Sequence, residues 1–262
     1  MRVLYVTTRQ WNPGDEFILR GSRAIMRACG VKETVAAIYN KSPQTTSLFE
    51  NLNFWKRPYF TSLWSSMDFA FNITHYDNSF KRNHDLSLYD AVVFAGSPAW
   101  YGGRLKPLYD KLKSYKGLVL FLGIGTPNKA LNLSDDEQAV LKRAHVFCRD
   151  EALSKNLNAL GITARYMPCP ALLSSPIERD APEAIKRVGL GFNTTKTHRY
   201  QRMSEAKFAS QSAIFDYMLD NFDCDIVSHY IDEIPEIARI YGADKLRYVY
   251  DSVDYPDLFS NY

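Results

Sequence analysis

The sequence predicts an α/β fold built on parallel sheets, and three observations support this prediction. Short apolar runs alternate with amphipathic helical patterns along most of the 262 residues, the order expected of strand–helix–strand units with right-handed crossovers. Two runs, at residues 90–96 and 117–123, are almost entirely apolar and end in glycine, as is typical of strands buried on both faces. With 46% hydrophobic residues, the chain can also bury a substantial core.

The first part of the chain is expected to form strands that alternate with helices. A helix from Asp15 to about Cys29 follows the first strand, and the apolar residues on one of its faces are Phe17, Ile18, Gly21, Ile25 and Cys29. Ser134 is the expected N-cap of another helix, and Gly161 closes a third. The expected strands are residues 3–6, 34–39, 90–96, 117–123, 145–150 and 163–167, and the later helices are residues 106–115, 134–144 and 151–161.

Two stretches interrupt this alternation. Residues 41–85 are polar and aromatic with weak periodicity, which indicates an insertion on the domain surface with one or two short helices. Residues 168–184 are rich in proline and are the best linker candidate. We therefore expect an N-terminal domain over residues 1–175 and a partial, short or truncated domain over residues 185–262. The second domain is expected to have strands at 187–193, 223–230 and 246–250 and helices at 204–222 and 231–242.

Composition excludes several classes of function. A formal net charge of +3 is too small to indicate nucleic-acid binding. No secretory signal and no apolar run long enough for a membrane span occurs, and the four cysteines are scattered without a Cys-x-x-Cys pair. These features favour a reducing, cytoplasmic location. The five histidines are scattered too, so no metal site is expected.

Candidate ligand residues lie in the turns after the strands, where open α/β sheets bind ligands. The first turn contains Asn12, Gly14 and Asp15. Gly14 permits a positive φ or a close approach of a ligand, and Asp15 is placed to cap the helix. A tight turn with an N-cap explains these two residues, whereas a ligand-binding loop would also explain Asn12. The residues leave both interpretations open.

The turn after residues 90–96 contains Gly96 and Ser97, followed by Trp100 and Tyr101. The two aromatic rings either stack on a sugar or nucleobase or fold back over the core. The next turn, "GIGTPN", contains Gly123 and Gly125 and is similar to a phosphate-cradling turn. A Gly-x-Gly pair is weak evidence for a dinucleotide site, however.

Three further candidate ligand-binding residues lie at or near the ends of other predicted strands. The Arg149 side chain is suited to hold a carboxylate or phosphate, or else to form an ion pair with Asp150 or another helix. In the second domain, His229 is either a structural histidine or a catalytic one, and Asn193 lies in a loop that can reach a polar ligand.

Taken in order, these turns resemble those of the polysaccharide pyruvyl transferase family over nearly the whole chain. The corresponding segments are "NPGDEFILRG", "YDAVVFAGSPAWYGG", "GIGTPN", "VFCRDEALSKNLNALGITARYMPCPALL" and "VSHYID". The resemblance implies two Rossmann-like, doubly wound domains in a GT-B-like arrangement. The family's downstream G-x-R-x-H motif does not occur before Tyr262, which is why we expect the second domain to be short or truncated.

The resemblance also implies a reaction. The family moves the pyruvyl unit of phosphoenolpyruvate onto a sugar of a cell-surface glycan, with phosphoenolpyruvate as co-substrate and no cofactor. By position, Asp15 would be the catalytic carboxylate and Asn12 would orient the acceptor. Arg149 would bind the anionic donor, and His229 would be the acid or a phosphate ligand. Gly14, Gly96, Ser97, Gly123, Gly125 and Asn193 are the remaining substrate-binding candidates.

Two other functions stay open. One is a sugar- or anion-binding relative without catalysis, and the other is a GT-B glycosyltransferase that uses a nucleotide sugar. The expected partners are a glycan or sugar acceptor and an anionic donor, with neither nucleic acid nor an integral membrane segment, while homo-oligomer formation is left open.

Overall fold

The computed structural model describes residues 1–8, 13–40, 74–77, 85–96, 100–126, 131–175, 187–192, 204–229, 233–248 and 258. These residues fall into two compact units, of which the first extends to Ser175 and the second starts at Arg187. Most of the expected linker at 168–184 and most of the expected insertion at 41–85 lie outside the described residues, so the predicted domain limits stay a prediction.

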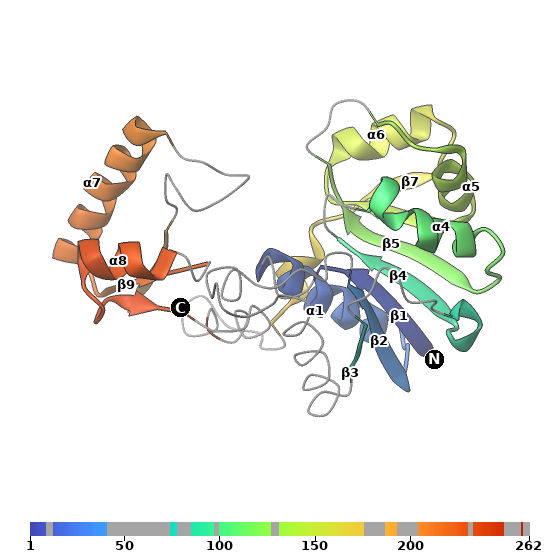
Figure 1. Cartoon of the computed structure of the whole chain (residues 1–262), viewed down its shortest axis with the longest axis horizontal. Coiled ribbons are helices and arrows are strands. Elements are labelled where there is room, and N and C mark those ends of the chain that lie inside the picture. Colours follow the sequence, from blue (N-terminus) through green and yellow to red (C-terminus); the bar gives the residue numbers. More distant parts are fainter. Residues whose placement is uncertain are drawn as a thin grey trace, which may run out of the picture. The chain divides into compact units, whose positions relative to one another are not determined.

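A parallel seven-stranded sheet forms the centre of the first unit (Figure 1). Its strand order is β3-β2-β1-β4-β5-β6-β7, and every neighbouring pair is parallel. The strands are β1 (Arg2–Thr7), β2 (Val35–Asn40), β3 (Thr74–Asp77), β4 (Ala91–Ala95), β5 (Leu118–Ile124), β6 (His145–Cys148) and β7 (Ala164–Tyr166). Strands β2 and β3 follow one another on one side of β1, and β4 then pairs with β1 on its other side. This confirms the doubly wound fold, whose reversal point lies between β1 and β4.

Helices cover both faces of this sheet, with α1 on one face and α4, α5 and α6 on the other (Figure 1). The helices are α1 (Pro13–Ala28), α4 (Lys106–Leu112), α5 (Asp135–Arg143) and α6 (Glu151–Ala159), with short 3-10 helices η1 (Leu86–Leu88), η2 (Gly103–Leu105) and η3 (Pro170–Leu173). Within the described ranges, no helix has both the length and the hydropathy needed to cross a bilayer.

Strand β4 shows why the sequence marks the central strands so clearly. All five of its residues are buried. Val92 and Phe94 belong to the core under α4, α5 and α6, whereas Ala91, Val93 and Ala95 belong to the core under α1. Because successive side chains point to opposite faces, a strand covered on both sides must be apolar at every position. The prediction of a doubly buried strand is therefore confirmed.

Ser134 caps α5 as predicted. Its Oγ accepts a hydrogen bond from the Glu137 amide at 3.3 Å, and the Glu137 carboxylate accepts one from the Ser134 amide at 2.7 Å. This reciprocal pair is a capping box, which satisfies two amides that the helix leaves unpaired.

Three details of the prediction are wrong. Helix α1 begins at Pro13, so Asp15 is its third residue and not its N-cap. The buried face of α1 matches the expected one only in part, because Ile18 and Gly21 are buried as predicted, whereas Leu19 and Met26 also pack in the core and Cys29 is exposed. The stretch interpreted as an insertion contains β3, which pairs in parallel with β2.

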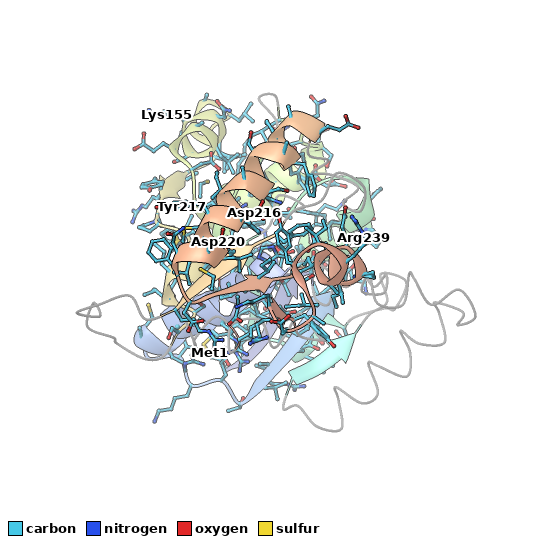
Figure 2. All side chains as sticks on the ribbon, turned by 90° about the vertical axis from the view of Figure 1, so that its left-hand side faces the viewer. Met1, Lys155, Asp216, Tyr217, Asp220 and Arg239 are labelled. Carbon is cyan, nitrogen blue, oxygen red and sulfur yellow. The ribbon has the colours of Figure 1, made fainter. Side chains whose placement is uncertain are left out.

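The second unit has a three-stranded parallel sheet with the order β10-β9-β8. Its elements are β8 (Val188–Gly191), α7 (Glu205–Asn221), β9 (Cys224–Val227), α8 (Ile234–Tyr241) and β10 (Leu246–Arg247), all near their predicted positions. Its core surrounds the fully buried Phe192, whose ring meets those of Phe208 and Tyr241 edge-on at centroid distances of 6.0 and 6.3 Å. The side of α7 that bears Asp216, Tyr217 and Asp220 is exposed (Figure 2).

An ion-pair cluster around the buried Asp225 carboxylate joins the strands of the second unit. The Asp225 side chain, which is 2% exposed, lies 2.9 Å from Arg187 Nε and 3.0 Å from Arg247 Nη2. A buried carboxylate needs such partners because desolvation of an unpaired charge is costly. Arg187 immediately precedes β8, so the cluster fixes β8 and β10 to the central strand β9.

Candidate functional site

The carboxyl edge of the seven-stranded sheet holds most of the predicted site residues. Because parallel strands end at the same edge, the segments after β1, β4, β5 and β6 all emerge there. These segments carry Gly14, Asp15, Gly96, Gly125 and Arg149, and Gly123 is the penultimate residue of β5. His229 follows β9 in the second unit. Asn12, Ser97 and Asn193 lie outside the described residues.

Helix α1 places two acidic residues in its first turn, Asp15 and Glu16. Both are buried, at 6% and 2% exposure, whereas Gly14 beside them is exposed. The amino end of a helix carries partial positive charge, which stabilises carboxylates at these positions. Asp15 is thus a buried carboxylate that the amino end of α1 stabilises, near the point where the strand order reverses, although it is not the N-cap of the helix. Our reading of the sequence did not single out Glu16, for which the only signal was its place next to Asp15.

Strand β1 ends on a second residue that the sequence analysis missed. The Oγ1 atom of Thr7 is buried and has no hydrogen-bond partner in the described part of the chain. Buried hydroxyl groups nearly always have a partner, so this orphaned oxygen marks an unusual polar position at the same edge. The only signal in the sequence was a polar residue that closes an apolar strand.

Gly96 and Gly123 have packing reasons to be glycine. Gly96 has a φ of 58°, and a Cβ there would lie 2.3 Å from Ile18 Cγ2 of α1. Gly123 has a φ of 67°, and a Cβ there would lie 2.2 Å from Pro170 Cδ of η3. The Gly96 amide already donates to the Leu122 carbonyl at 2.8 Å, so it is not available to an anion. A substrate-binding role for the two residues stays a prediction.

Trp100 folds back into the core, as one of the two interpretations expected. Its side chain is fully buried, and its ring packs against those of Tyr101 and Phe121 at centroid distances of 4.6 and 6.2 Å. The indole Nε1 donates to the Gly125 carbonyl at 3.0 Å, and Tyr109 Oη donates to the Trp100 carbonyl at 2.7 Å. Trp100 therefore links the turn after β4 to the turn after β5 and offers no face to a sugar.

Arg149 is the half-buried cation of this edge. Its amide donates to the Ile124 carbonyl at 2.9 Å, and its side chain crosses over Gly125. Among the residues that the structure describes, its guanidinium has no hydrogen-bond or ion-pair partner. Asp150, the expected structural partner, instead caps α6 by accepting from the Leu153 amide at 2.6 Å. The arginine fork is thus available to an anion.

His229 is held by the backbone of the second unit. Its ring packs on Gly191, where a Cβ would lie 3.0 Å from His229 Cε1, and it hydrogen-bonds to the backbone of Phe192. Its amide donates to the buried Glu233 carboxylate at 3.0 Å. Burial lowers the pKa of the imidazole below its ordinary value, and the bond to Phe192 opposes this only in part. The neutral form is favoured, which suits hydrogen bonding to a ligand better than proton donation at neutral pH.

The lowered pKa of His229 leads to a pH prediction. The pKa of His229 is lower in the folded protein than in the unfolded chain. Above about pH 6.5 the ring is neutral in both states, so its titration does not change the free energy of unfolding. As the pH falls below about 6.5, the unfolded chain binds the proton more readily, and the second unit loses stability. We expect the stability difference between about pH 7.5 and about pH 5 to shrink in His229→Gln. Thermal melting at both values measures it, with the exposed His145→Gln as control. An unchanged difference in His229→Gln would contradict the prediction.

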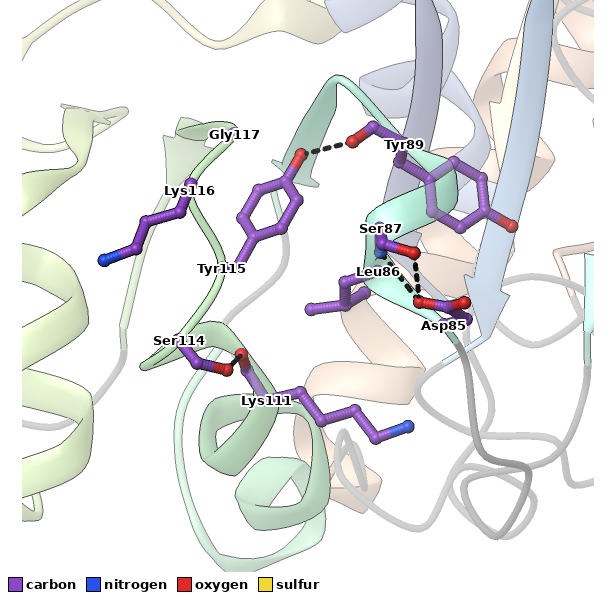
Figure 3. Close-up of a pocket in the computed structure, with 9 residues that line it drawn as sticks. All are labelled: Asp85, Leu86, Ser87, Tyr89, Lys111, Ser114, Tyr115, Lys116 and Gly117. Carbon is purple, nitrogen blue, oxygen red and sulfur yellow. Dashed lines mark hydrogen bonds between the residues drawn. The ribbon is translucent and has the colours of Figure 1, made fainter.

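A pocket of about 740 Å³ lies at the opposite, amino edge of the first sheet (Figure 3). It is bordered by Tyr89, which precedes β4, and by Gly117, which precedes β5. Its two lysines, Lys111 and Lys116, extend in different directions (Figure 3). The cations do not converge, so we assign no ligand to this pocket.

Comparison with known proteins supports the fold and identifies the family. The structure is similar to a crystal structure of a putative UDP-N-acetylglucosamine 2-epimerase from Listeria monocytogenes, with a TM-score of 0.51 and 12% identity over 98% of this chain and 71% of that one. This likeness is one of GT-B-like fold only. An uncharacterized protein from Klebsiella pneumoniae matches with a TM-score of 0.41 and 10% identity over 100% of this chain and 90% of that one.

No curated protein matches the chain by sequence. The family model described as polysaccharide pyruvyl transferase, in contrast, matches residues 12–260. That range includes the strand-end turns that led to the same resemblance and covers nearly all of both units. The chain therefore belongs to the polysaccharide pyruvyl transferase family.

Proposed function

We propose that this protein transfers the pyruvyl group of phosphoenolpyruvate to a sugar of a cell-surface glycan. The observation that carries the proposal is Arg149, a half-buried guanidinium with no partner among the described residues. It lies at the carboxyl edge of a Rossmann-like sheet, the edge at which open α/β sheets generally bind ligands. Arginine binds carboxylate and phosphate oxygens through two parallel hydrogen bonds. Phosphoenolpyruvate carries both groups, so a single fork of this kind suits it well.

The reaction needs a proton, an acceptor hydroxyl and a place for negative charge. A proton drawn from solvent converts the donor's methylene carbon into a methyl group and leaves an oxocarbenium-like centre on the neighbouring carbon. A sugar hydroxyl attacks this centre, the bond from carbon to the phosphate oxygen breaks, and phosphate leaves. Attack by a second hydroxyl closes a cyclic ketal, and the protons of the two hydroxyls are released. Fixed charges and hydrogen-bond donors at the departing phosphate stabilise this transition state.

The described residues suggest how the work is divided. Arg149 binds the carboxylate or phosphate of the donor. Asp15, a carboxylate held in the first turn of α1, accepts a hydrogen bond from the acceptor hydroxyl and takes up its proton as the bond forms. The role that the family resemblance implies for His229, in the second unit, stays a prediction, and burial favours the neutral form of its ring. Asn12, by its position in the sequence, is proposed to orient the acceptor.

Phosphate release tests the proposal. The protein is incubated with phosphoenolpyruvate and a panel of glycans that present neighbouring free hydroxyl pairs, and inorganic phosphate and pyruvylated sugar are measured together. We expect both products only when donor and acceptor are present, and neither with Asp15→Asn. Sugar binding without either product would indicate a binding relative. Release of nucleotide from a nucleotide sugar would indicate a glycosyltransferase, and either result would overturn the proposal.

A further inference from the structure

Gly125 supports the Arg149 side chain. A Cβ built at Gly125 would lie 2.7 Å from Arg149 Nε and 3.3 Å from Arg149 Cγ. Real Cβ atoms do not come within 2.7 Å of a neighbouring atom, so a residue with a side chain at position 125 would clash with Arg149 Nε. The guanidinium end therefore lies so close to the backbone of residue 125 that only glycine fits there without a shift. Gly125 is buried, and the side chains of Arg149 and Asp150 lie over it, with Arg149 the closer of the two.

Gly125 is in turn fixed by Trp100, which comes from a different strand-end turn. The indole N–H donates to the Gly125 carbonyl at 3.0 Å across a sequence separation of 25 residues. Trp100 cannot shift easily, because it is fully buried against Phe121 and its own carbonyl accepts from Tyr109 at 2.7 Å. The support under Arg149 is therefore anchored in the core of the first unit.

The backbone of Arg149 is fixed as well. The Arg149 amide donates to the carbonyl of Ile124, the residue before Gly125, at 2.9 Å. The carboxylate of Asp150 also lies over Gly125, with Oδ2 at 3.2 Å from the same Cβ position, but its other oxygen caps α6. Arg149 is thus held at its backbone and along its stem, while the guanidinium makes no hydrogen bond to the residues that the structure describes.

We propose that Gly125 and Trp100 are positioning residues that aim Arg149 at the anionic donor. Trp100 fixes the Gly125 carbonyl, and Gly125, by lacking a Cβ, lets the arginine lie flat over the chain. Neither residue contacts the anion. The inference rests on the proposed function for the identity of the anion, but the geometry that it concerns is independent of that function.

The first test is a double-mutant cycle read as phosphoenolpyruvate affinity in titration calorimetry. Gly125→Ala is expected to weaken binding by up to the roughly tenfold loss expected of Arg149→Ala, because a displaced group loses much of its interaction with the ligand. In an Arg149→Ala background, the same substitution should change nothing further. Trp100→Phe, which keeps an aromatic side chain of smaller size but removes the N–H donor, should show the same dependence on Arg149 with a smaller loss.

Two controls separate positioning from general damage. Gly103→Ala adds a methyl group where nothing lies within 4 Å. Tyr115→Phe removes a different hydrogen bond to a backbone carbonyl, that of Tyr89 at 3.0 Å, at the amino edge of the sheet. Both should bind as the wild type does. If Gly125→Ala weakens binding equally in both backgrounds, or not at all while Arg149→Ala does, the inference is wrong.

A second readout needs no ligand. Phenylglyoxal modifies accessible arginine side chains, and mass spectrometry reports the rate at Arg149. We expect faster modification in Gly125→Ala than in the wild type and in Gly103→Ala. Equal rates would overturn the inference whatever the binding results. A faster rate together with no effect of Arg149→Ala on affinity would keep the inference and reject the proposed donor role of Arg149.

Discussion

Replacement of Arg149 by alanine is expected to weaken phosphoenolpyruvate binding by roughly tenfold or more, the scale of a lost charge-assisted hydrogen-bond pair. The guanidinium is half-buried, so its interaction with an anion is screened less than that of a surface charge. It has no carboxylate partner among the described residues, so an anion gains its full attraction without first breaking an ion pair. Titration calorimetry with phosphoenolpyruvate measures the loss.

Two companion variants make this result specific. Arg149→Lys keeps the charge but loses the planar fork, so it should recover only part of the affinity. Arg27→Ala removes an equal charge from the exposed last turn of α1, at the amino edge of the sheet, and should bind like the wild type. Unchanged affinity in Arg149→Ala would remove this residue from the site. An equal loss in Arg27→Ala would show that only the overall charge matters.

A Gly21→Ala substitution is expected to destabilise the first unit by about 3 kcal/mol. Inside an exposed helix the same change usually stabilises by about 0.5–1 kcal/mol, because alanine restricts the unfolded chain. Here the sign reverses, because a Cβ at Gly21 would lie 1.7 Å from the Pro170 carbonyl oxygen of η3. The obstacle is backbone, so it cannot rotate away as a side chain would, and α1 must separate from η3.

Melting temperature and hydrogen exchange together check this result. For a unit of this size, the loss corresponds to a fall in Tm of roughly 6–12 °C. Peptides from α1 and η3 should lose protection in hydrogen-exchange mass spectrometry, while peptides from α7 in the second unit serve as the internal reference. Gly103→Ala, in open space, is the matched control. A Gly21→Ala protein as stable as the wild type would show that α1 does not pack on η3 in this way.

Much of the fold could be predicted because it depends on local patterns. The apolar runs at 90–96 and 117–123 became β4 and β5 because a strand covered on both faces must be apolar throughout. The Ser134 capping box connects residues three positions apart, so both partners are visible in one short segment. Strand β3 was missed because an edge strand needs only one neighbour and has no continuous apolar run.

The candidate site was predicted less completely than the fold. The sequence placed Asp15 and Arg149 at strand ends, and the strand order then brings these ends to one edge of the sheet. It did not distinguish a stacking Trp100 from a buried one. That choice depends on Tyr109 and Gly125, whose positions relative to Trp100 are set by packing of the whole unit.

The sequence by itself determined the order of strands and helices apart from β3, the family resemblance and the short set of polar residues that end the strands. Only the tertiary structure decided that Gly125 lies beneath Arg149, that Trp100 anchors Gly125, and that Asp150 caps a helix instead of pairing with Arg149. The physical reason is the separation in sequence over which each interaction acts. Periodicity and capping act between near neighbours in the chain, whereas the position of a side chain over another backbone is fixed only when distant strands pair and their cores pack.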